Sequence, residues 1–257
     1  MKIDVLTLFP EMFEGFKNTS IIKRAISKDS VNFDVTNIRD YTLDKNYRVD
    51  DYPIGGGAGL VMMCQPLVDA IKAVKKENSK VIYMSPKGKS FKQEDAIRLS
   101  KEEHVVIVCG HYEGIDERVL DYVDEQISIG DYILTGGELA SMVVSDAIIR
   151  LLDGAITETS LDVESFDNGL LEYPQYTFPR VYEGKSVPDI LFCGNHEAVR
   201  KWRLKQQLKE TMKYRPDLLK DRVFSKEEIK LLKEIEDGIE EPKWYVDAIE
   251  KGKKFMK

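Results

Sequence analysis

The segment VVIVCGHYEGIDER, from Val105 to Arg118, begins with a β-rich apolar run and then changes abruptly to glycines and polar side chains. A short apolar run bounded in this way is typical of a buried strand followed by a loop. Similar runs occur at Lys2 to Leu8, Val81 to Met84 and Ile127 to Ile129, and helix-like stretches separate them. This alternation predicts an α/β fold with a mostly parallel sheet.

Polar, glycine-bearing loops follow three of these strands: SPKG (Ser85 to Gly88), CGHYEGIDER (Cys109 to Arg118) and IGDYILTGGEL (Ile129 to Leu139). In open α/β sheets the carboxyl ends of the strands gather such loops into one crevice, where glycines let the backbone approach a ligand. Each loop alone could be an ordinary tight turn, but together they predict a binding site. The glycines of IGGGAGL (Ile54 to Leu60) match neither a phosphate-binding loop nor a dinucleotide motif, so this segment is either a loop that shapes itself on a substrate or a flexible turn.

Composition limits the class of protein. The 257 residues, 42% hydrophobic and 32% charged, suffice for one large domain or two modest ones, and we favour two. No apolar stretch approaches the roughly 18 to 20 residues of a membrane span, and MKIDVLTLFP at the amino terminus has a strand pattern rather than that of a signal peptide. We therefore expect a cytoplasmic protein without membrane association. Cys64, Cys109 and Cys193 are widely separated and predict reduced thiols rather than a disulfide framework or a zinc site.

Three helices can be predicted from periodicity and capping signals. One runs from Glu138 to Leu152, is apolar on most faces and should be buried against the sheet or another subunit, with Gly154 ending it. A basic helix begins after the N-cap Asn195 and ends before Pro216. The last begins at Ser225, whose capping-box partner is Glu228, turns Ile229, Leu232 and Ile235 inward, and ends near Gly238. These last two helices predict a small helical domain.

The basic helix carries a row of lysines spaced four residues apart: Lys201, Lys205, Lys209 and Lys213. Leu204, Leu208 and Met212 form an apolar row one position away, so one face should pack while the lysine face meets water or phosphate. The net charge of −7 argues against nucleic-acid binding through the whole surface and leaves this helix as the strongest electropositive patch. From the residues alone, a solvated face and an RNA-binding face remain open.

Several of these segments occur together, in order, in one known family. They are LFPEMF (Leu8 to Phe13), VDDYPIGGGAGLVMMCQPL (Val49 to Leu67), the three loops, ESFDNGLLEYPQYTFP (Glu164 to Pro179) and GNHEAVRKWRLKQ (Gly194 to Gln206). Over nearly its whole length the chain resembles the bacterial tRNA (guanine-N1)-methyltransferases, dimeric enzymes of the SPOUT class that use S-adenosylmethionine. The resemblance implies a deep trefoil knot in the sheet domain and a small carboxyl-terminal helical domain. The expected boundaries are 1–158 for the knotted domain, 159–175 for a linker, 176–246 for the tRNA-binding helical domain and 247–257 for a solvated tail.

The resemblance also implies which residues contact the cofactor. An adenine edge suits backbone hydrogen bonds, and its face suits apolar side chains. Lys87 and Ala140 depart from the family pattern, which has Gln and often Pro there, and neither change should block binding. The expected cofactor contacts are Tyr83, Met84, Ser85, Pro86, Gly88, Gly110, Glu113, Ile129, Gly130, Asp131, Tyr132, Ile133, Leu134, Gly136 and Gly137.

Methylation of guanine N1 requires a base that removes its proton before in-line attack on the methyl group, and a carboxylate can serve. The family places an aspartate before SF and GLL, where this chain has Glu164, one methylene longer. Asp162 and Asp167 are the alternative bases, and each would need a shifted register. Arg150, the single cation of an apolar helix, either forms a structural ion pair or, by resemblance, stabilises charge on guanine O6.

By resemblance, the substrate is tRNA with guanosine 37, next to the anticodon, as the target. The base must be unpaired or flipped outward, because N1 lies on its pairing edge. Lys201, Arg203, Lys205 and Lys209 are the expected tRNA contacts, and the active site lies at the interface of a homodimer. Magnesium assistance is also part of the resemblance, but no metal ligands can be assigned.

The sequence also allows two other functions, and its three histidines need to be assigned roles. A ribose 2′-O-methyltransferase would share the cofactor fold without needing the carboxylate linker, and an RNA-binding module without turnover would fit the Glu164 departure. His111, in the second loop, is expected to be solvated or to make a polar contact rather than to transfer protons. His104 and His196 are expected to be structural.

Overall fold

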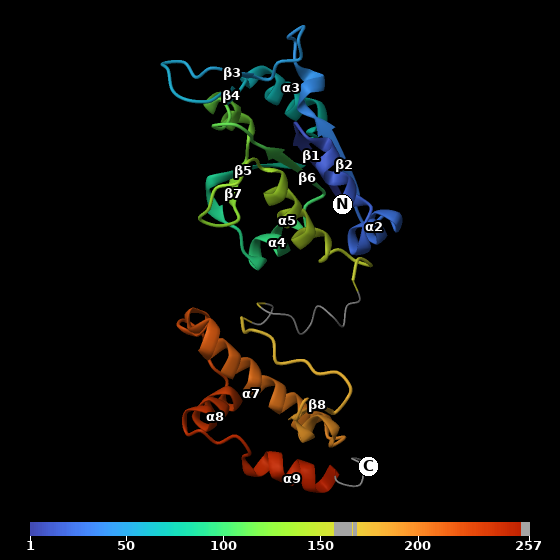
Figure 1. Ribbon diagram of the computed structural model, residues 1–257, viewed down its shortest axis with the longest axis vertical. Coiled ribbons are helices and arrows are strands. Elements are labelled where there is room, and N and C mark those ends of the chain that lie inside the picture. The colour runs from blue at the N-terminus through green and yellow to red at the C-terminus, as the bar shows by residue number, and fades with distance from the viewer. Residues whose placement is uncertain (157–165, 167–168, 253–257) are drawn as a thin grey trace. The chain divides into compact units, whose positions relative to one another are not determined.

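The computed structural model describes residues 1–156, 166 and 169–252 (Figure 1). It divides into two compact units, Met1–Glu158 and Thr159–Lys257. The amino-terminal unit holds the sheet and the predicted ligand-binding loops. The carboxyl-terminal unit is mostly helical.

A five-stranded sheet forms the centre of the first unit, and every neighbouring pair in it is parallel. The predicted α/β class with a parallel sheet is therefore confirmed. The strand His104–Cys109 at its centre is buried along its whole length, which explains why it reads as a nearly unbroken apolar run. In spatial order the strands are β2 (Asn32–Asn37), β1 (Lys2–Thr7), β6 (His104–Cys109), β5 (Ser79–Ser90) and β7 (Glu125–Ser128).

Helices cover both faces of this sheet (Figure 1). Side chains alternate along β6, so that Val105 and Ile107 join one apolar cluster while Val106 and Val108 join the other. The first cluster includes side chains of α2 (Ser20–Ser27), α4 (Gln93–Leu99) and α5 (Glu138–Ile149), and the second includes those of α3 (Cys64–Val74) and the 3-10 helix η3 (Glu117–Tyr122). The remaining elements of this unit are η1 (Pro10–Phe13), α1 (Glu14–Lys17), η2 (Ile38–Tyr41), β3 (Asp50–Asp51) and β4 (Val61–Met62).

Helix α5 is shorter and less enclosed than its sequence predicts. It ends at Ile149 rather than Leu152, and Arg150 is its C-cap residue. Gly154 has a φ of 79° but lies beyond the helix end, so it does not terminate the helix. Leu139 and Val143 are each about half exposed, at 50% and 51%, so the sheet covers only part of this apolar helix.

His104 has the structural role that the sequence predicts. Its buried ring lies 2.6 Å from Asp4 through Nε2 and 2.7 Å from Ser79 through Nδ1. These residues are at the amino-terminal ends of β1, β5 and β6, so their contacts connect the three strands at that edge of the sheet. The predicted ligand-binding loops lie at the opposite edge.

The second unit is built around one long helix. Helix α7 runs from His196 to Tyr214, and the Asn195 side chain accepts a hydrogen bond of 3.1 Å from the Ala198 N–H. This N-cap and the helix end before Pro216 are confirmed. Around α7 lie β8 (Val181–Tyr182), β9 (Lys185–Ser186), η4 (Asp189–Phe192), η5 (Pro216–Leu219), α8 (Lys226–Glu236) and α9 (Lys243–Gly252).

Helix α8 has the predicted capping box, but its buried face differs from the prediction. The Ser225 side chain accepts from the Glu228 N–H at 3.2 Å, and the Glu228 carboxylate accepts from the Ser225 N–H at 2.7 Å. Ile229 was expected to point inward, yet it is 56% exposed, whereas Leu231 is fully buried. Leu232 and Ile235 are partly buried against the apolar cluster of this unit, as predicted, so the prediction is wrong for Ile229 alone and missed Leu231.

Two predicted boundaries of the second unit are also wrong. Residues 247–252, expected in a solvated tail, form the second half of α9, and Gly252 packs directly on the backbone of Cys193. Leu170 and Tyr173, expected in the linker, are buried within the unit. The Leu171 N–H donates to the Thr211 hydroxyl at 2.9 Å, which fixes this stretch on α7.

Candidate functional site

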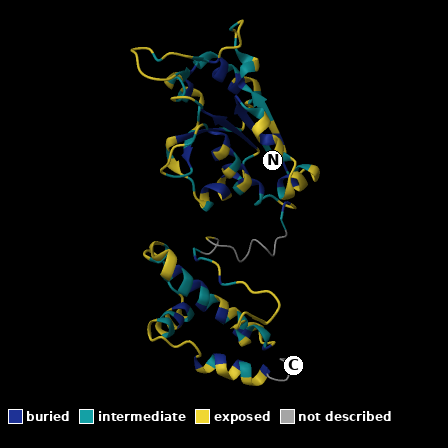
Figure 2. Cartoon of the chain, viewed as in Figure 1, coloured by how far each residue is buried: buried dark blue, intermediate teal, exposed yellow. Residues whose placement is uncertain are grey.

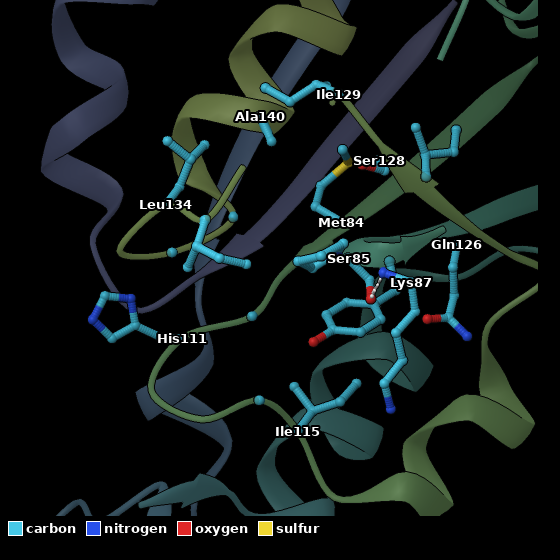
Figure 3. Close-up of a pocket in the computed structure, with 18 of the residues that line it drawn as sticks. Met84, Ser85, Lys87, His111, Ile115, Gln126, Ser128, Ile129, Leu134 and Ala140 are labelled. Atoms are coloured by element: carbon cyan, nitrogen blue, oxygen red, sulfur yellow. Dashed lines mark hydrogen bonds between the residues drawn. The ribbon is translucent and has the colours of Figure 1, made fainter. Parts of the chain in front are cut away.

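A cavity of about 540 Å³ lies at the carboxyl ends of β5, β6 and β7 (Figure 3). All three predicted loops line it, which confirms that they converge on one place. Of the expected cofactor contacts, all except Gly88 and Asp131 are among the lining residues.

The first loop is an excursion within a strand rather than the end of one. Strand β5 pairs with β7 up to Met84 and again from Lys89, and residues Ser85 to Gly88 bulge outward between them. A side chain at Gly88 would collide with the backbone of Gln126 and Ile127, so close packing of the strands requires glycine at this position. Within the bulge the Lys87 N–H donates to the Ser85 hydroxyl at 3.2 Å (Figure 3).

The second and third loops are joined to each other through glycine backbone. The Gly137 N–H donates to the Gly110 carbonyl at 2.8 Å, and His111 and Gly136 form an antiparallel bridge. A Cβ atom at Gly137 would lie 2.8 Å from the Cys109 Cα and 3.1 Å from the Gly110 N. Only glycine allows the loops to approach this closely, which explains the glycines that the sequence places here.

Tyr83 is a buried wall of the cavity. A Cβ at Gly110 would come within 2.7 Å of the Tyr83 hydroxyl, so the tyrosine ring lies directly against the second loop. Burial, with a smaller contribution from the charge of Glu117, raises the pKa of Tyr83 to about 12. The phenol is therefore a neutral hydrogen-bonding group at physiological pH.

The cavity combines apolar side chains with polar backbone. Figure 3 shows Ile129, Leu134 and Ala140 on one side of the cavity and Ile115 on the other. Such a lining suits a flat organic ring that is held by backbone hydrogen bonds at its edge. Ile115, Gln126 and Ser128 also line the cavity and were not predicted from the sequence. Gln126 and Ser128 lie on β7 before its loop, and only their direction in the sheet brings them to the cavity.

His111 is less exposed than expected for a loop histidine. Its ring packs 4.9 Å from the Phe9 ring and 5.0 Å from the Tyr112 ring, and it lines the cavity (Figure 3). Its Nδ1 atom is buried and has no hydrogen-bond partner within the part of the chain that the structure describes. A Cβ atom at Gly136 would lie 2.5 Å from this nitrogen, so the ring packs against the third loop.

Beneath the cavity, a buried carboxylate anchors the start of α5. The Thr7 hydroxyl donates to Glu138 at 2.8 Å, and both residues are buried. Glu138 lies in the first turn of α5, where a negative charge interacts favourably with the helix dipole. This bond ties β1 to the helix that follows the third loop.

The cysteines fit the expectation of reduced thiols. Cys109 is fully buried behind the loops, and burial raises the pKa of its thiol. Burial also raises the pKa of Cys64. Both thiols are therefore protonated and unreactive at neutral pH.

The structure places only part of the expected catalytic apparatus. Arg150 is partly buried at the carboxyl end of α5. Glu164 and the alternative bases Asp162 and Asp167 lie outside the described residues. Just beyond them in the chain, Leu170 is fully buried against the helices of the second unit.

One lysine of the row on α7, Lys205, does not face solvent as predicted, whereas Lys213 is exposed. Lys205 is 4% exposed, and its ammonium donates to Glu234 at 3.1 Å and to the Ile239 carbonyl at 2.5 Å. Lys209 pairs with Glu240 at 2.8 Å but remains partly exposed. The expectation that Lys205 meets phosphate is therefore wrong, because the segment after α8 covers this part of the helix.

Neither a metal cluster nor a membrane-spanning helix occurs in residues 1–156, 166 and 169–252. That part of the chain contains no group of three or more His, Cys, Asp or Glu side chains able to hold a metal ion. It also contains no helix long and apolar enough to cross a bilayer.

Fold and cavity together define an α/β protein of the class that holds a small organic ligand at the carboxyl edge of a parallel sheet. A family model described as tRNA (Guanine-1)-methyltransferase TrmD matches residues 1–221. The chain belongs to this family, as the resemblance of its motifs implied.

Similar proteins extend the match over most of the chain. A "tRNA (guanine-N(1)-)-methyltransferase" of Clostridium botulinum (strain 657 / Type Ba4) is 58% identical over 236 residues, which are 91% of this chain and 98% of that protein. A protein of the same name from Clostridium perfringens (strain 13 / Type A) is 57% identical over 235 residues, which are 91% and 99% of the two chains.

Proposed function

We propose that this protein transfers a methyl group from S-adenosylmethionine to N1 of guanosine 37 in tRNA. The observation that carries the proposal is the cavity in which three glycine-bearing loops meet at the carboxyl edge of the sheet, in a chain of the tRNA (Guanine-1)-methyltransferase family. The trefoil knot of such enzymes belongs to the same proposal. So does a cytoplasmic location, where the tRNA substrate is found.

The residues of the cavity fit S-adenosylmethionine. At Gly110 and Gly137 the space that a side chain would fill is taken by Tyr83 and by the backbone of Cys109, so only glycine lets these loops close around the cavity. Ile129, Leu134 and Ile115 would cover the adenine faces, and backbone groups of the third loop would bond its edge. When bound, the cofactor supplies an electrophilic methyl group on a sulfonium centre.

Glu164 removes the N1 proton of guanine in this proposal. A carboxylate close to N1 raises the nucleophilicity of that nitrogen as the proton leaves. Arg150 stabilises the negative charge that then develops on guanine O6, since its guanidinium is charged at all relevant pH values. Leu170, six positions after Glu164 in the chain, is buried within the second unit.

The enzyme would act as a homodimer in which each site is completed by the partner subunit. Support comes from the half-exposed apolar side chains of Leu139 and Val143 on α5, and from Ile133 in the third loop, which is largely exposed. Exposed apolar groups grouped next to a binding site are typical of an interface. A second subunit that covered them would also limit access of water to the cavity.

Contacts to the tRNA backbone would come from α7. Lys201, Arg203 and Lys209 keep the proposed role, whereas the burial of Lys205 removes it from the set. Lys209 can exchange its exposed ion pair with Glu240 for a phosphate at little cost, because exposed pairs contribute little stability.

The test uses radiolabelled S-adenosylmethionine and tRNA transcripts with guanosine or adenosine at position 37. We expect label on N1 of guanosine 37 only. Glu164→Gln should lower turnover by about 10²- to 10⁴-fold while the affinities for cofactor and tRNA persist. Asp162→Asn and Asp167→Asn serve as matched controls and should retain turnover. Label on ribose, or no transfer by the intact chain, would refute the proposal, and unchanged turnover of Glu164→Gln would refute the role of this residue.

A further inference from the structure

The segment before η4 presents aromatic side chains on the surface of the second unit. Tyr176 and Tyr182 are well exposed, and Phe178 is 81% exposed. The stretch that leads into the β8–β9 hairpin is exposed along most of its length in Figure 2. Large aromatic rings that are left in solvent are costly, so this cluster suggests a surface for binding.

A hollow of about 230 Å³ lies between this segment and α7. Five of its twelve lining residues are aromatic, which is a high proportion for a surface depression. Neighbouring rings are in contact range, with centroids 6.5 Å apart for Phe178 and Phe192 and 6.4 Å apart for Tyr176 and Trp202. The aromatic lining residues are Tyr173, Tyr176, Phe178, Phe192 and Trp202.

Guanidinium groups lie over the rings of this hollow. The Arg180 guanidinium carbon is 4.0 Å from the centroid of Phe192, and that of Arg203 is 4.8 Å from the centroid of Tyr173. Both cations are held in place by cation–π contact, so little side-chain entropy remains to be lost on binding. Gln175 adds an amide that can donate and accept hydrogen bonds at the rim.

We propose that this hollow binds one unpaired nucleobase of the tRNA, distinct from the guanine that is methylated. The inference rests on the proposed function for the identity of the RNA. Aromatic faces and guanidinium planes are the surfaces on which proteins stack unpaired bases, and a cation beside them pairs with the adjoining phosphate. An apolar protein segment would match the rings but would cover the exposed guanidinium of Arg203 without offering it a negative charge. A nucleotide supplies a base for the aromatic rings and a phosphate for the guanidinium, so RNA is the occupant that the chemistry favours.

The test measures RNA binding by the full-length chain, with no methyl transfer required. Fluorescence anisotropy would compare a labelled single-stranded oligoadenylate with an RNA duplex of equal charge, over a series of salt concentrations. Phe178→Ala removes an exposed ring and should leave folding intact, which circular dichroism would verify. Tyr214→Ala, an exposed aromatic at the far end of α7, is the matched control, and Phe178→Trp keeps a stacking surface.

We expect Phe178→Ala to weaken binding of the single strand by about 5- to 100-fold. The slope of affinity against salt should stay the same, because no charge is lost. Tyr214→Ala and Phe178→Trp should bind as the unaltered protein does. Equal affinity of Phe178→Ala and the unaltered protein for the single strand, or an equal loss for duplex and single strand, would overturn the proposal. So would concentration-dependent self-association that Phe178→Ala abolishes, since the occupant would then be a second copy of the chain. A protein that transfers no methyl group but shows this base-dependent binding would refute only the proposed function.

Discussion

Replacement of Gly137 by alanine tests whether close backbone packing between the second and third loops forms the cavity. The added Cβ would lie 2.8 Å from the Cys109 Cα and 3.1 Å from the Gly110 N, both of which are backbone atoms. Non-bonded carbon atoms are best separated by about 3.5 to 4.0 Å, so the loops must separate by about 0.7 Å or more. No side-chain rotation can relieve this contact.

The expected loss in the free energy of unfolding of Gly137→Ala has two contributions. Overpacking of a well-filled site destabilises by about 1 to 3 kcal/mol. Separation of the loops also stretches the 2.8 Å bond from the Gly137 N–H to the Gly110 carbonyl, which contributes about 1 kcal/mol. The sum is about 2 to 4 kcal/mol. For a unit of this size it should lower the melting temperature by about 4 to 15 °C.

Calorimetric titration with S-adenosylmethionine and thermal unfolding followed by fluorescence would measure both effects. We expect at least about tenfold weaker cofactor binding by Gly137→Ala, since the displaced loops line the cavity. Gly15→Ala is the matched control, because no atom lies within 4 Å of a Cβ at Gly15 in α1. It should melt at the same temperature or slightly higher, as alanine favours helix. If Gly137→Ala bound the cofactor and melted like the unaltered protein, the argument from close packing would be wrong.

Three further outcomes are expected. Lys205→Ala should destabilise the protein by about 2 kcal/mol in urea titrations, because it removes a buried side chain and its two charge-assisted hydrogen bonds to Glu234 and Ile239. Lys209→Ala, which removes an exposed pair, should cost less than about 1 kcal/mol; similar losses for both would contradict the burial of Lys205. Thr7→Val should cost about 1.5 to 3 kcal/mol, since it leaves the buried Glu138 carboxylate without its hydroxyl donor, and an unchanged unfolding midpoint would show that this bond is unimportant. Burial alone would raise the pKa of Glu228, but its ion pair and backbone hydrogen bonds outweigh burial and hold that pKa below the usual 4.5. The stabilisation is therefore present above about pH 4.5 and is lost as the pH falls through the lowered value, so Glu228→Gln should flatten this part of the stability profile, and an unchanged acid limb would exclude the carboxylate as its source.

The cavity was predictable from sequence to the extent that it depends on neighbouring residues. Each apolar run followed by glycines predicts a strand and a loop, and parallel strands bring such loops to one edge. Gly88 shows the limit of this reasoning. Its place in a glycine-bearing loop indicated ligand contact. In the structure, the backbone of Gln126 and Ile127 occupies the space that a side chain at this position would need, and these residues lie about forty positions away in the chain.

Helix α8 illustrates a similar limit within a single element. The capping box of Ser225 and Glu228 is confirmed because its two partners are three residues apart and their geometry is that of any helix start. The buried face was predicted correctly at Leu232 and Ile235 but not at Ile229, because the closely spaced Ile229, Leu231 and Leu232 allow more than one apolar stripe. The choice of Leu231 over Ile229 depends on where α7 lies against α8.

Sequence alone determined the class of fold, the parallel strands, the loops at their carboxyl ends, the helix caps and the family. All of these depend on local backbone preferences and on motifs whose residues are close in the chain. Only tertiary structure decided which side of each helix is covered. The lysines of α7 recur at a spacing typical of an exposed face, yet Lys205 is buried by groups 29 and 34 residues away, Glu234 and Ile239. The periodicity of a helix specifies which side chains share a face, whereas burial depends on the segment that packs there.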